Sequence, residues 1–360
     1  MITLEKIRIR QIKLFRNLFA HVVFWYCSFL FFIFLTGEEL LFKNYFNLFE
    51  SDSIYYILLF LSISISILFS FLDLLFTDRA MRFFPRRFMI FLKTILYFIS
   101  VFVIIFIAVE LPIELIIQKD YIKILSYLPD MEIAFIRFLS YFYISGYLIN
   151  FLKAVVKKVG RGNFKDWALG MLNKPREQKR IFMFIDMKAS TTIAEKLMHK
   201  KFSHLVQDVF NDMSVVDNYN GEIYQYLGDG AIISWSLKSG LKYNNCLNAF
   251  YAFNKVISKR ERYYQRKYDL CPKFKAGIHV GNVMVLQVGQ IRRDISYNGD
   301  TLNATARIES MCNEFKQKLL ISGDLYDLLK NKNSFNFKNL GNVKLKGKRK
   351  GVDIYQVKQK

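Results

Sequence analysis

The sequence predicts two folding units: an α-helical transmembrane bundle of about four helices, followed by an α+β domain. Three observations support this prediction. The 360-residue chain is 52% hydrophobic and 17% aromatic, with 36 phenylalanines, and the apolar excess lies almost wholly before residue 155. Basic and acidic connecting segments alternate along that first half. The second half has mixed charge and alternates strand-like with helix-like segments.

The first 155 residues are expected to form a transmembrane domain in a lipid bilayer. A helix needs roughly 20 apolar residues to span the hydrocarbon core. Four stretches fit this length: residues 17–37, 53–72, 88–109 and 131–152. Lys93 interrupts the third near its end, where it can snorkel, and Glu132 and Arg137 make the fourth less apolar. Because the charges lie near span ends, anchoring, dimerisation or sensing is favoured over transport.

The connecting segments predict the orientation of this bundle. The N-terminal arm, the segment between spans two and three and the exit from span four are basic. The other two segments are acidic or mixed. Lys and Arg stay on the cytoplasmic side. We therefore expect a multi-pass protein of the inner cell membrane, with its N-terminus and its second half in the cytoplasm.

The net charge of +22 fits a protein that lies against anionic lipid. Nucleic-acid binding would rest on composition alone and is not expected. One basic run lies in the second half and either faces phosphates or forms a solvated turn: Lys344, Lys346, Lys348, Arg349 and Lys350. The four cysteines lack metal-ligand spacing and indicate reduced thiols.

Residues 156–179 are polar and predict a cytoplasmic linker that leads into a second domain, residues 180–360. "RIFMFID" then predicts an apolar strand that ends in Asp186. The segment "KASTT", with Thr191 and Thr192, precedes a helix over residues 193–216. A carboxylate at a strand end can hold a cation, while the amides of the following helix N-terminus receive an anion.

A β-hairpin is predicted next, over residues 221–227 and 231–235, with Gly228, Asp229 and Gly230 at its turn. Taken alone, Asp-Gly is ordinary turn chemistry. Because Asp186 precedes it, two carboxylates on adjacent strands could instead share a pair of Mg²⁺ or Mn²⁺ ions.

The remaining elements are a helix over residues 243–266, two strands around a Gly281-Asn282 turn, a helix and two final strands. His279 has no His or Cys partner nearby and is interpreted as structural. Asn303 and Arg307 lie four residues apart on one helix face. They are either a surface pair or a hydroxyl-binding and a phosphate-binding group.

Four segments in this order resemble the catalytic core of the class III adenylate and guanylate cyclases: "FMFIDMKASTT", "YQYLGDG", "YNGDTLNATARI" and "VKLKGK". The resemblance covers roughly residues 175–360. It implies a ferredoxin-like α+β class III cyclase catalytic domain. It also implies an active site at the interface of a homodimer, with ATP as substrate and two Mg²⁺ or Mn²⁺ ions per site.

The resemblance also implies roles for individual residues. Asp186 and Asp229 match the two metal-binding aspartates of the family. Asn303 matches the Asn that orients the ribose, and Arg307 matches the Arg that stabilises the transition state. Lys346 matches the Lys that contacts the terminal phosphates. Thr191 and Thr192 would lie close to the bound nucleotide.

Two positions depart from the family's base-reading pattern. Gln225 replaces the Lys that reads the purine in many members, and Ser296 replaces an Asp or Thr partner. Because Gln both donates and accepts, adenine and guanine both stay open. Three readings follow: an adenylate cyclase, a guanylate cyclase of the same mechanism, or a membrane receptor with a silent cyclase-like domain.

Overall fold

A computed structural model describes most of the chain. The described residues are 2–36, 53–75, 92, 95–97, 99, 128–159, 167, 169–291, 294–330, 332–344 and 351–360. The chain divides into two compact units, Met1–Lys153 and Ala154–Lys360. Each unit has its own hydrophobic core, and each is described separately below.

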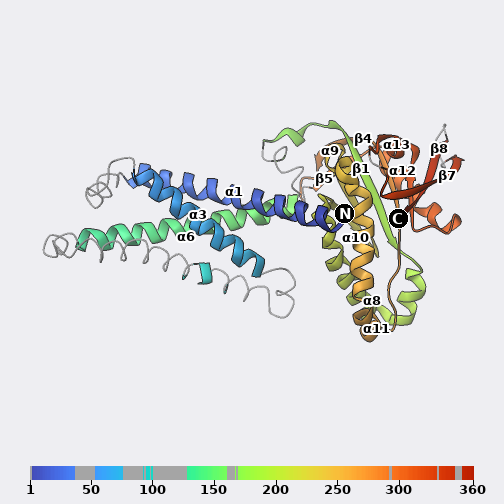
Figure 1. Ribbon diagram of the computed structural model, residues 1–360, viewed down its shortest axis with the longest axis horizontal. Helices are drawn as coiled ribbons and strands as arrows, with labels where there is room; N and C mark the ends of the chain where they lie inside the picture. Colours follow the sequence, from blue (N-terminus) through green and yellow to red (C-terminus); the bar gives the residue numbers. More distant parts are fainter. Residues whose placement is uncertain are drawn as a thin grey trace. The chain divides into compact units, whose positions relative to one another are not determined.

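The first unit contains the helices α1 (Ile2–Thr36), α3 (Ser53–Leu75) and the greater part of α6 (Leu128–Val159) (Figure 1). Its core is aromatic. The ring of Trp25 stacks on Phe142 with centroids 4.5 Å apart and meets Phe69 edge-on at 5.4 Å. Phe69 in turn stacks on Tyr97 at 3.9 Å. Such pairs contribute about 0.5–1.5 kcal/mol each beyond the area that they bury.

The four predicted spans have different outcomes. Residues 17–37 and 53–72 lie in α1 and α3, apart from residue 37, and residues 131–152 lie in α6. Residues 88–109 fall largely outside the described part of the chain. Within the described ranges, one helical segment, Asn17–Thr36, is long and apolar enough to cross a membrane, and a shorter apolar segment is Leu58–Leu72. The predicted bundle of four membrane helices is therefore supported only in part.

The second unit is built on a βαββαβ core. Its elements are β1 (Arg176–Met187), α8 (Ser190–Met213), β2 (Glu222–Leu227), β3 (Gly230–Ser236), α10 (Asn245–Lys259) and β4 (Phe274–Val288). The strands pair antiparallel in the order β2-β3-β1-β4. This connectivity is that of the ferredoxin-like motif, which the family resemblance implies.

Further elements extend this core. They are a 3₁₀ turn (Met171–Asn173), a 3₁₀ helix (Ser214–Tyr219), α9 (Leu237–Leu241), a second 3₁₀ turn (Lys242–Asn244), α11 (Glu261–Tyr268), β5 (Asp294–Asn298), α12 (Asp300–Glu314), β6 (Leu319–Ser322), α13 (Gly323–Leu328), β7 (Phe335–Val343) and β8 (Val352–Gln359). Strands β6, β8 and β7 continue the sheet beyond β4, and β5 pairs with the end of β4. Because β4 and β6 are parallel, the sheet is mixed.

The alternation along β1 assigns its two faces. Ile181, Met183 and Ile185 are buried in the large core beneath α8 and α10 (Figure 1). Phe182 and Asp186 point to the opposite face, where α12 covers β4. The carboxylate of Asp186 therefore emerges on the α12 side of the sheet.

The predicted turn at Gly281-Asn282 is wrong, because β4 runs unbroken through it and pairs with β1 from Arg176 to Met187. Gly281 serves helix packing instead. A Cβ there would lie 2.4 Å from Thr301 Oγ1 on α12. The Thr301 hydroxyl donates to the carbonyl of Asn282 at 2.7 Å. A glycine within a strand commonly marks such a close approach.

The predicted helix over residues 243–266 is two helices, α10 and α11. The helical backbone is interrupted at Arg260, with φ −102° and ψ 13°. The Arg260 side chain pairs with Asp212 on α8 and lies over the rings of Tyr263 and Tyr264. The linker boundaries also differ from the observed elements, since α6 continues to Val159 and β1 begins at Arg176.

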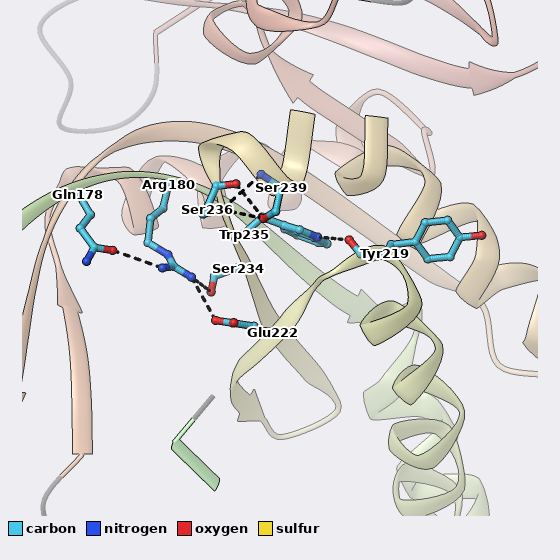
Figure 2. A network of polar contacts seen from close by, with 8 residues as sticks. All are labelled: Gln178, Arg180, Tyr219, Glu222, Ser234, Trp235, Ser236 and Ser239. Atoms are coloured by element: carbon cyan, nitrogen blue, oxygen red, sulfur yellow. Dashed lines mark hydrogen bonds and ion pairs between the residues drawn. The ribbon is translucent and has the colours of Figure 1, made fainter. Parts of the chain in front are cut away.

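A buried polar network ties β1 to the hairpin of β2 and β3 (Figure 2). The guanidinium of Arg180, which is 3% exposed, donates to Ser234 Oγ at 3.1 Å and pairs with Glu222 at 3.3 Å. It also donates to the Gln178 side chain at 3.3 Å. The indole of Trp235 donates to the carbonyl of Tyr219 at 3.0 Å. These bonds hold in place the β2–β3 hairpin, whose turn carries Asp229.

Candidate active site

The tight turn between β2 and β3 holds Asp229 beside the end of β1. Gly228 adopts a left-handed conformation with φ 57°, which a two-residue hairpin turn of this hand needs. A Cβ on Gly230 would lie 2.7 Å from the carbonyl oxygen of Ile185 and 3.1 Å from Asp186 Oδ1. The absence of a side chain at Gly230 therefore lets the turn approach Asp186. The two predicted carboxylates do come together.

Two further charged residues complete this acidic site. Lys275 pairs directly with Asp186 in the β1–β4 ladder. Its Nζ lies 3.3 Å from Asp186 Oδ2 and 2.7 Å from Glu309 Oε1 on α12. Two carboxylates, from Asp186 and Glu309, thus pair with one ammonium group, and the charge of Asp229 acts on both of them.

Burial and neighbouring charges shift the pKa values of three groups in this cluster. Burial and then the charge of Asp229 raise the pKa of Asp186, and Lys275 offsets this only in part. Burial likewise raises the pKa of Glu309. Although burial alone would lower the pKa of Lys275, the hydrogen bond and charge of Glu309 and the charge of Asp186 outweigh it and raise that pKa. A cation at this site would be favoured electrostatically.

The site fits divalent ions. Asp229 Oδ2 is buried and makes no hydrogen bond in the structure. A buried carboxylate oxygen without a partner is costly unless a ligand completes it. Within the described ranges no group of three or more His, Cys, Asp or Glu residues is arranged to hold a metal. A divalent ion held by Asp186 and Asp229 would take its other ligands from substrate phosphates and water, which is the usual way that Mg²⁺ binds.

Thr191 and Thr192 lie exposed in the first turn of α8, directly after the strand that ends beside Asp186. The cap residue Ala189 is left-handed, with φ 55°, and provides no side-chain hydrogen bond to the helix. The helical backbone of α8 is interrupted at Met198, with φ 59° and ψ 163°. The first amides of its N-terminal segment are not capped by a side chain. Such amides suit a phosphate near the acidic pair.

Asn303 and Arg307 share one edge of α12, as the sequence predicts, but they do not join the acidic site of their own chain. Successive helical residues are rotated by about 100°, so Arg307 and Glu309 point about 200° apart. Glu309 faces Lys275 and Asp186. Asn303 is exposed and Arg307 half-buried on the other edge of the helix.

The two base-reading candidates lie on different strands. Gln225 is exposed on β2, next to a bulge between Ile223 and Gln225. Ser296 lies on β5, where its hydroxyl donates to Asn298 Oδ1 at 3.0 Å. These strands are not neighbours in the sheet. Lys346 falls outside the described residues, in the connection between β7 and β8.

His279 is buried on β4, and its Nδ1 lies 2.8 Å from Ser322 Oγ and 3.9 Å from Asp324 Oδ2. Ser322 Oγ also caps α13 by accepting from the amide of Leu325. Because Ser322 and Asp324 approach the same ring nitrogen, these residues do not form a nucleophilic triad. The structure agrees with a structural role for His279.

The sequence interpretation missed Lys275 and Glu309. Lys275 lies within the apolar strand segment "FKAGIHV". Glu309 lies two residues after Arg307 in the sequence, on a different face of the helix. A charged residue inside a buried strand is a signal, since buried charges are almost always paired. The partner of Lys275, however, lies 34 residues later on another element, so only the tertiary fold reveals the pair.

The fold and the acidic pair define the class to which this chain belongs: a ferredoxin-like α+β domain with carboxylates at the end of its first strand and in its first hairpin. Residues 172–359 match the model of the adenylate and guanylate cyclase catalytic domain. The chain belongs to this family.

Several known proteins are similar to this chain. Adenylate cyclase 2 of Rhizobium meliloti (strain 1021) is 30% identical over 201 residues, which are 56% of this chain and 55% of that protein. Adenylate cyclase 1 of the same organism is 30% identical over 185 residues, 49% of this chain and 27% of that protein. The chain thus spans about half or less of these relatives' lengths. A solved bacterial light-regulated adenylyl cyclase shares the fold, with a TM-score of 0.50 at 19% identity, covering 60% of this chain and 65% of that one.

Proposed function

We propose that this protein is an adenylate cyclase that converts ATP to 3′,5′-cyclic AMP and pyrophosphate. The observation that carries the proposal is the half-buried acidic pair of Asp186 and Asp229 in a domain of the cyclase family. One oxygen of this pair, Asp229 Oδ2, is buried and makes no hydrogen bond. The names of the two Rhizobium relatives support ATP as the substrate.

The reaction needs no covalent enzyme intermediate. The ribose 3′-oxygen attacks the α-phosphorus in line, the bond from that phosphorus to the β-phosphate oxygen breaks, and the 3′-hydroxyl proton leaves to solvent. Two divalent ions held by Asp186 and Asp229 would lower the pKa of the 3′-hydroxyl and neutralise charge on the triphosphate. The chain's own residues supply position and charge, as phosphoryl transfer generally requires.

Each remaining site residue has a proposed task. Asn303 orients the ribose, and Arg307 compensates the negative charge that develops at the α-phosphate. Lys346 and the first turn of α8, with Thr191 and Thr192, receive the terminal phosphates. The base is read by two residues that can donate and accept hydrogen bonds, Gln225 and Ser296.

The active site is assembled from two copies of the chain. In one chain, Arg307 and Glu309 leave α12 on opposite edges, and Glu309 is the one that reaches the acidic pair. Asn303 and Arg307 therefore act on the nucleotide bound at the aspartates of a second copy. A symmetric homodimer then carries two equivalent sites.

The first unit anchors the enzyme in the inner membrane, with the second unit in the cytoplasm. The segment Asn17–Thr36 has the length and hydropathy for a membrane span. Large apolar side chains are exposed on all three described helices, among them Phe34 at 81%, Tyr56 at 72% and Ile144 at 64%. Exposed apolar side chains in this number favour contact with lipid or with another protein. The segment after α6 would transmit changes in the bundle to the catalytic domain.

The first experiment offers ATP and GTP separately, with Mn²⁺, to full-length protein purified in detergent from carbonate-washed membranes. Asp229→Asn removes one carboxylate charge at the site, and Asp269→Asn is the matched surface control. We expect cyclic AMP from ATP, a loss of at least a hundredfold in Asp229→Asn, and normal activity in the control.

Two results would contradict the proposal. Cyclic GMP from GTP with no product from ATP would make the protein a guanylate cyclase. No cyclic product from either nucleotide, in a folded dimer, would make it a receptor with a silent domain. Recovery of the chain in the carbonate supernatant would overturn the membrane anchor.

A further inference from the structure

The ammonium group of Lys275 lies beside Asp186, a proposed metal-binding carboxylate, and supplies a positive charge there. Lys275 lies directly opposite Asp186 in the β1–β4 ladder, and its side chain is 9% exposed. Its Nζ is 3.3 Å from Asp186 Oδ2. A nearly buried lysine is stable only when its charge is paired. Lys275 therefore pairs with Asp186 in the protein without metal.

Glu309 is the second partner of this ammonium, at 2.7 Å. Its backbone is fixed, because α12 packs directly on β4: a Cβ on Gly277 would lie 2.3 Å from the Glu309 amide nitrogen. Its side chain is 13% exposed. Lys275, in contrast, carries its charge on a flexible four-carbon stem. Of the two residues, the lysine is the one that can move between carboxylates.

We propose that Lys275 is a positioning residue of the metal site: it pairs with Asp186 until divalent ions bind, and Glu309 then retains its ammonium group. This rests on the proposed function, since it takes Asp186 and Asp229 as the metal-binding residues. Lys275 competes with the divalent ion for Asp186. Glu309 reduces that competition by holding the ammonium away from Asp186.

The two residues therefore have opposite effects on metal affinity. Removing the charge of Lys275 leaves three carboxylates facing one another, which strengthens the binding of a cation. Removing the charge of Glu309 leaves Asp186 as the sole anionic partner of Lys275, which strengthens their ion pair and weakens cation binding. Groups that hold metal ligands in place typically change affinity by tenfold to a hundredfold.

The experiment titrates full-length protein with Mn²⁺ alone and measures free Mn²⁺ by electron paramagnetic resonance, so no turnover is involved. We expect Lys275→Met to tighten Mn²⁺ binding by on the order of tenfold and Glu309→Gln to weaken it by a similar factor. Lys275→Arg keeps the charge and should keep the affinity of the unchanged protein. Glu314→Gln, at the exposed end of α12, is the matched control for Glu309.

Thermal unfolding separates this role from a purely structural one. Lys275→Met should lower the melting temperature of the metal-free protein, and saturating Mn²⁺ should restore it. A structural lysine would instead give the same loss with and without Mn²⁺, which would overturn the proposal. In the Lys275→Met background, Glu309→Gln should weaken Mn²⁺ binding clearly less than in the unchanged protein. Additive effects would also overturn it.

The variant Asp186→Asn tests the proposed metal site separately from the role of Lys275. Loss of Mn²⁺ binding in this variant, with no change in Lys275→Met, would leave the metal site standing and reject the role of Lys275. Equal Mn²⁺ binding by Asp186→Asn and the unchanged protein would reject the proposed metal site, and the role of Lys275 with it.

Discussion

Gly230 determines how closely the hairpin turn can approach Asp186. A Cβ at this position would lie 2.7 Å from a backbone oxygen of β1 and 3.1 Å from the Asp186 carboxylate. Nothing lies within 4 Å of the corresponding position at Gly228, on the other side of Asp229. The two glycines of this turn therefore have different functions. Gly230 leaves room for the close approach of the turn to β1, and Gly228 allows the left-handed backbone conformation.

We predict that Gly230→Ala lowers kcat for cyclic AMP formation by on the order of a hundredfold, because it displaces the acidic pair by a fraction of an ångström or more. Gly228→Asn is the matched control, since Asn tolerates a left-handed conformation and has open space there. Full activity of Gly230→Ala would mean that the turn can move without disturbing the site.

For individual residues, the sequence predicts the acidic pair but not the lysine that pairs with it. Asp186 ends an apolar strand and Asp229 sits in a two-residue turn, and both features are local. The contact of Lys275 with Glu309 depends on how α12 docks on β4. No local pattern encodes that docking, so the ion pair becomes visible only in the fold.

The helices α8 and α11 are joined by hydrogen bonds to one carboxylate. Asp208 Oδ2 accepts from the hydroxyls of Tyr263 and Tyr268, each at 2.7 Å, and from Lys267 at 2.9 Å. Burial alone would raise the pKa of Asp208, but these hydrogen bonds outweigh it and hold that pKa below its ordinary value. The carboxylate therefore stabilises the folded state.

We predict that Asp208→Asn destabilises the protein by about 2 kcal/mol at pH 7, the scale of hydrogen bonds to a charged group. A carboxyl with a lowered pKa stabilises the fold above its unfolded pKa of about 4 and loses this effect as the pH falls through the folded pKa. Melting temperatures from pH 7 to pH 3 should thus converge for the variant and the unchanged protein. A gap that stays constant with pH would contradict this.

Element boundaries are where the sequence predictions fail. Gly281-Asn282 has strong turn propensity, yet tertiary packing against Thr301 makes it the middle of a 15-residue strand. The segment over residues 243–266 lacks a Gly or Pro at which a break would be expected. Its interruption at Arg260 accompanies an ion pair with Asp212 on another helix. Both differences arise from long-range contacts that override local preference.

For the whole molecule, composition predicts a transmembrane domain up to residue 155 and a separate catalytic domain. The structure divides into the compact units Met1–Lys153 and Ala154–Lys360. The order of the core strands is the ferredoxin-like order that the resemblance to the class III cyclases implies. The predicted number of membrane spans is supported only in part by the structure. Hydropathy alone selects four stretches, whereas one described helix meets the criterion for a span.

Mixing two inactive variants tests most directly whether this protein makes cyclic AMP at a site shared by two chains. Asp186→Asn lacks a metal ligand, and Arg307→Ala lacks the phosphate-binding group. They would be co-expressed with different affinity tags, and the heterodimer would be purified through both. Each variant alone should form no cyclic AMP from ATP with Mn²⁺.

The heterodimer holds one site with both residues intact and one with both changed if the site is shared. We therefore predict about half the activity of the unchanged dimer. If Asp186 and Arg307 instead served the same chain's site, every site would carry one defect. A purified heterodimer with no activity above the single variants would contradict an active site shared by two chains.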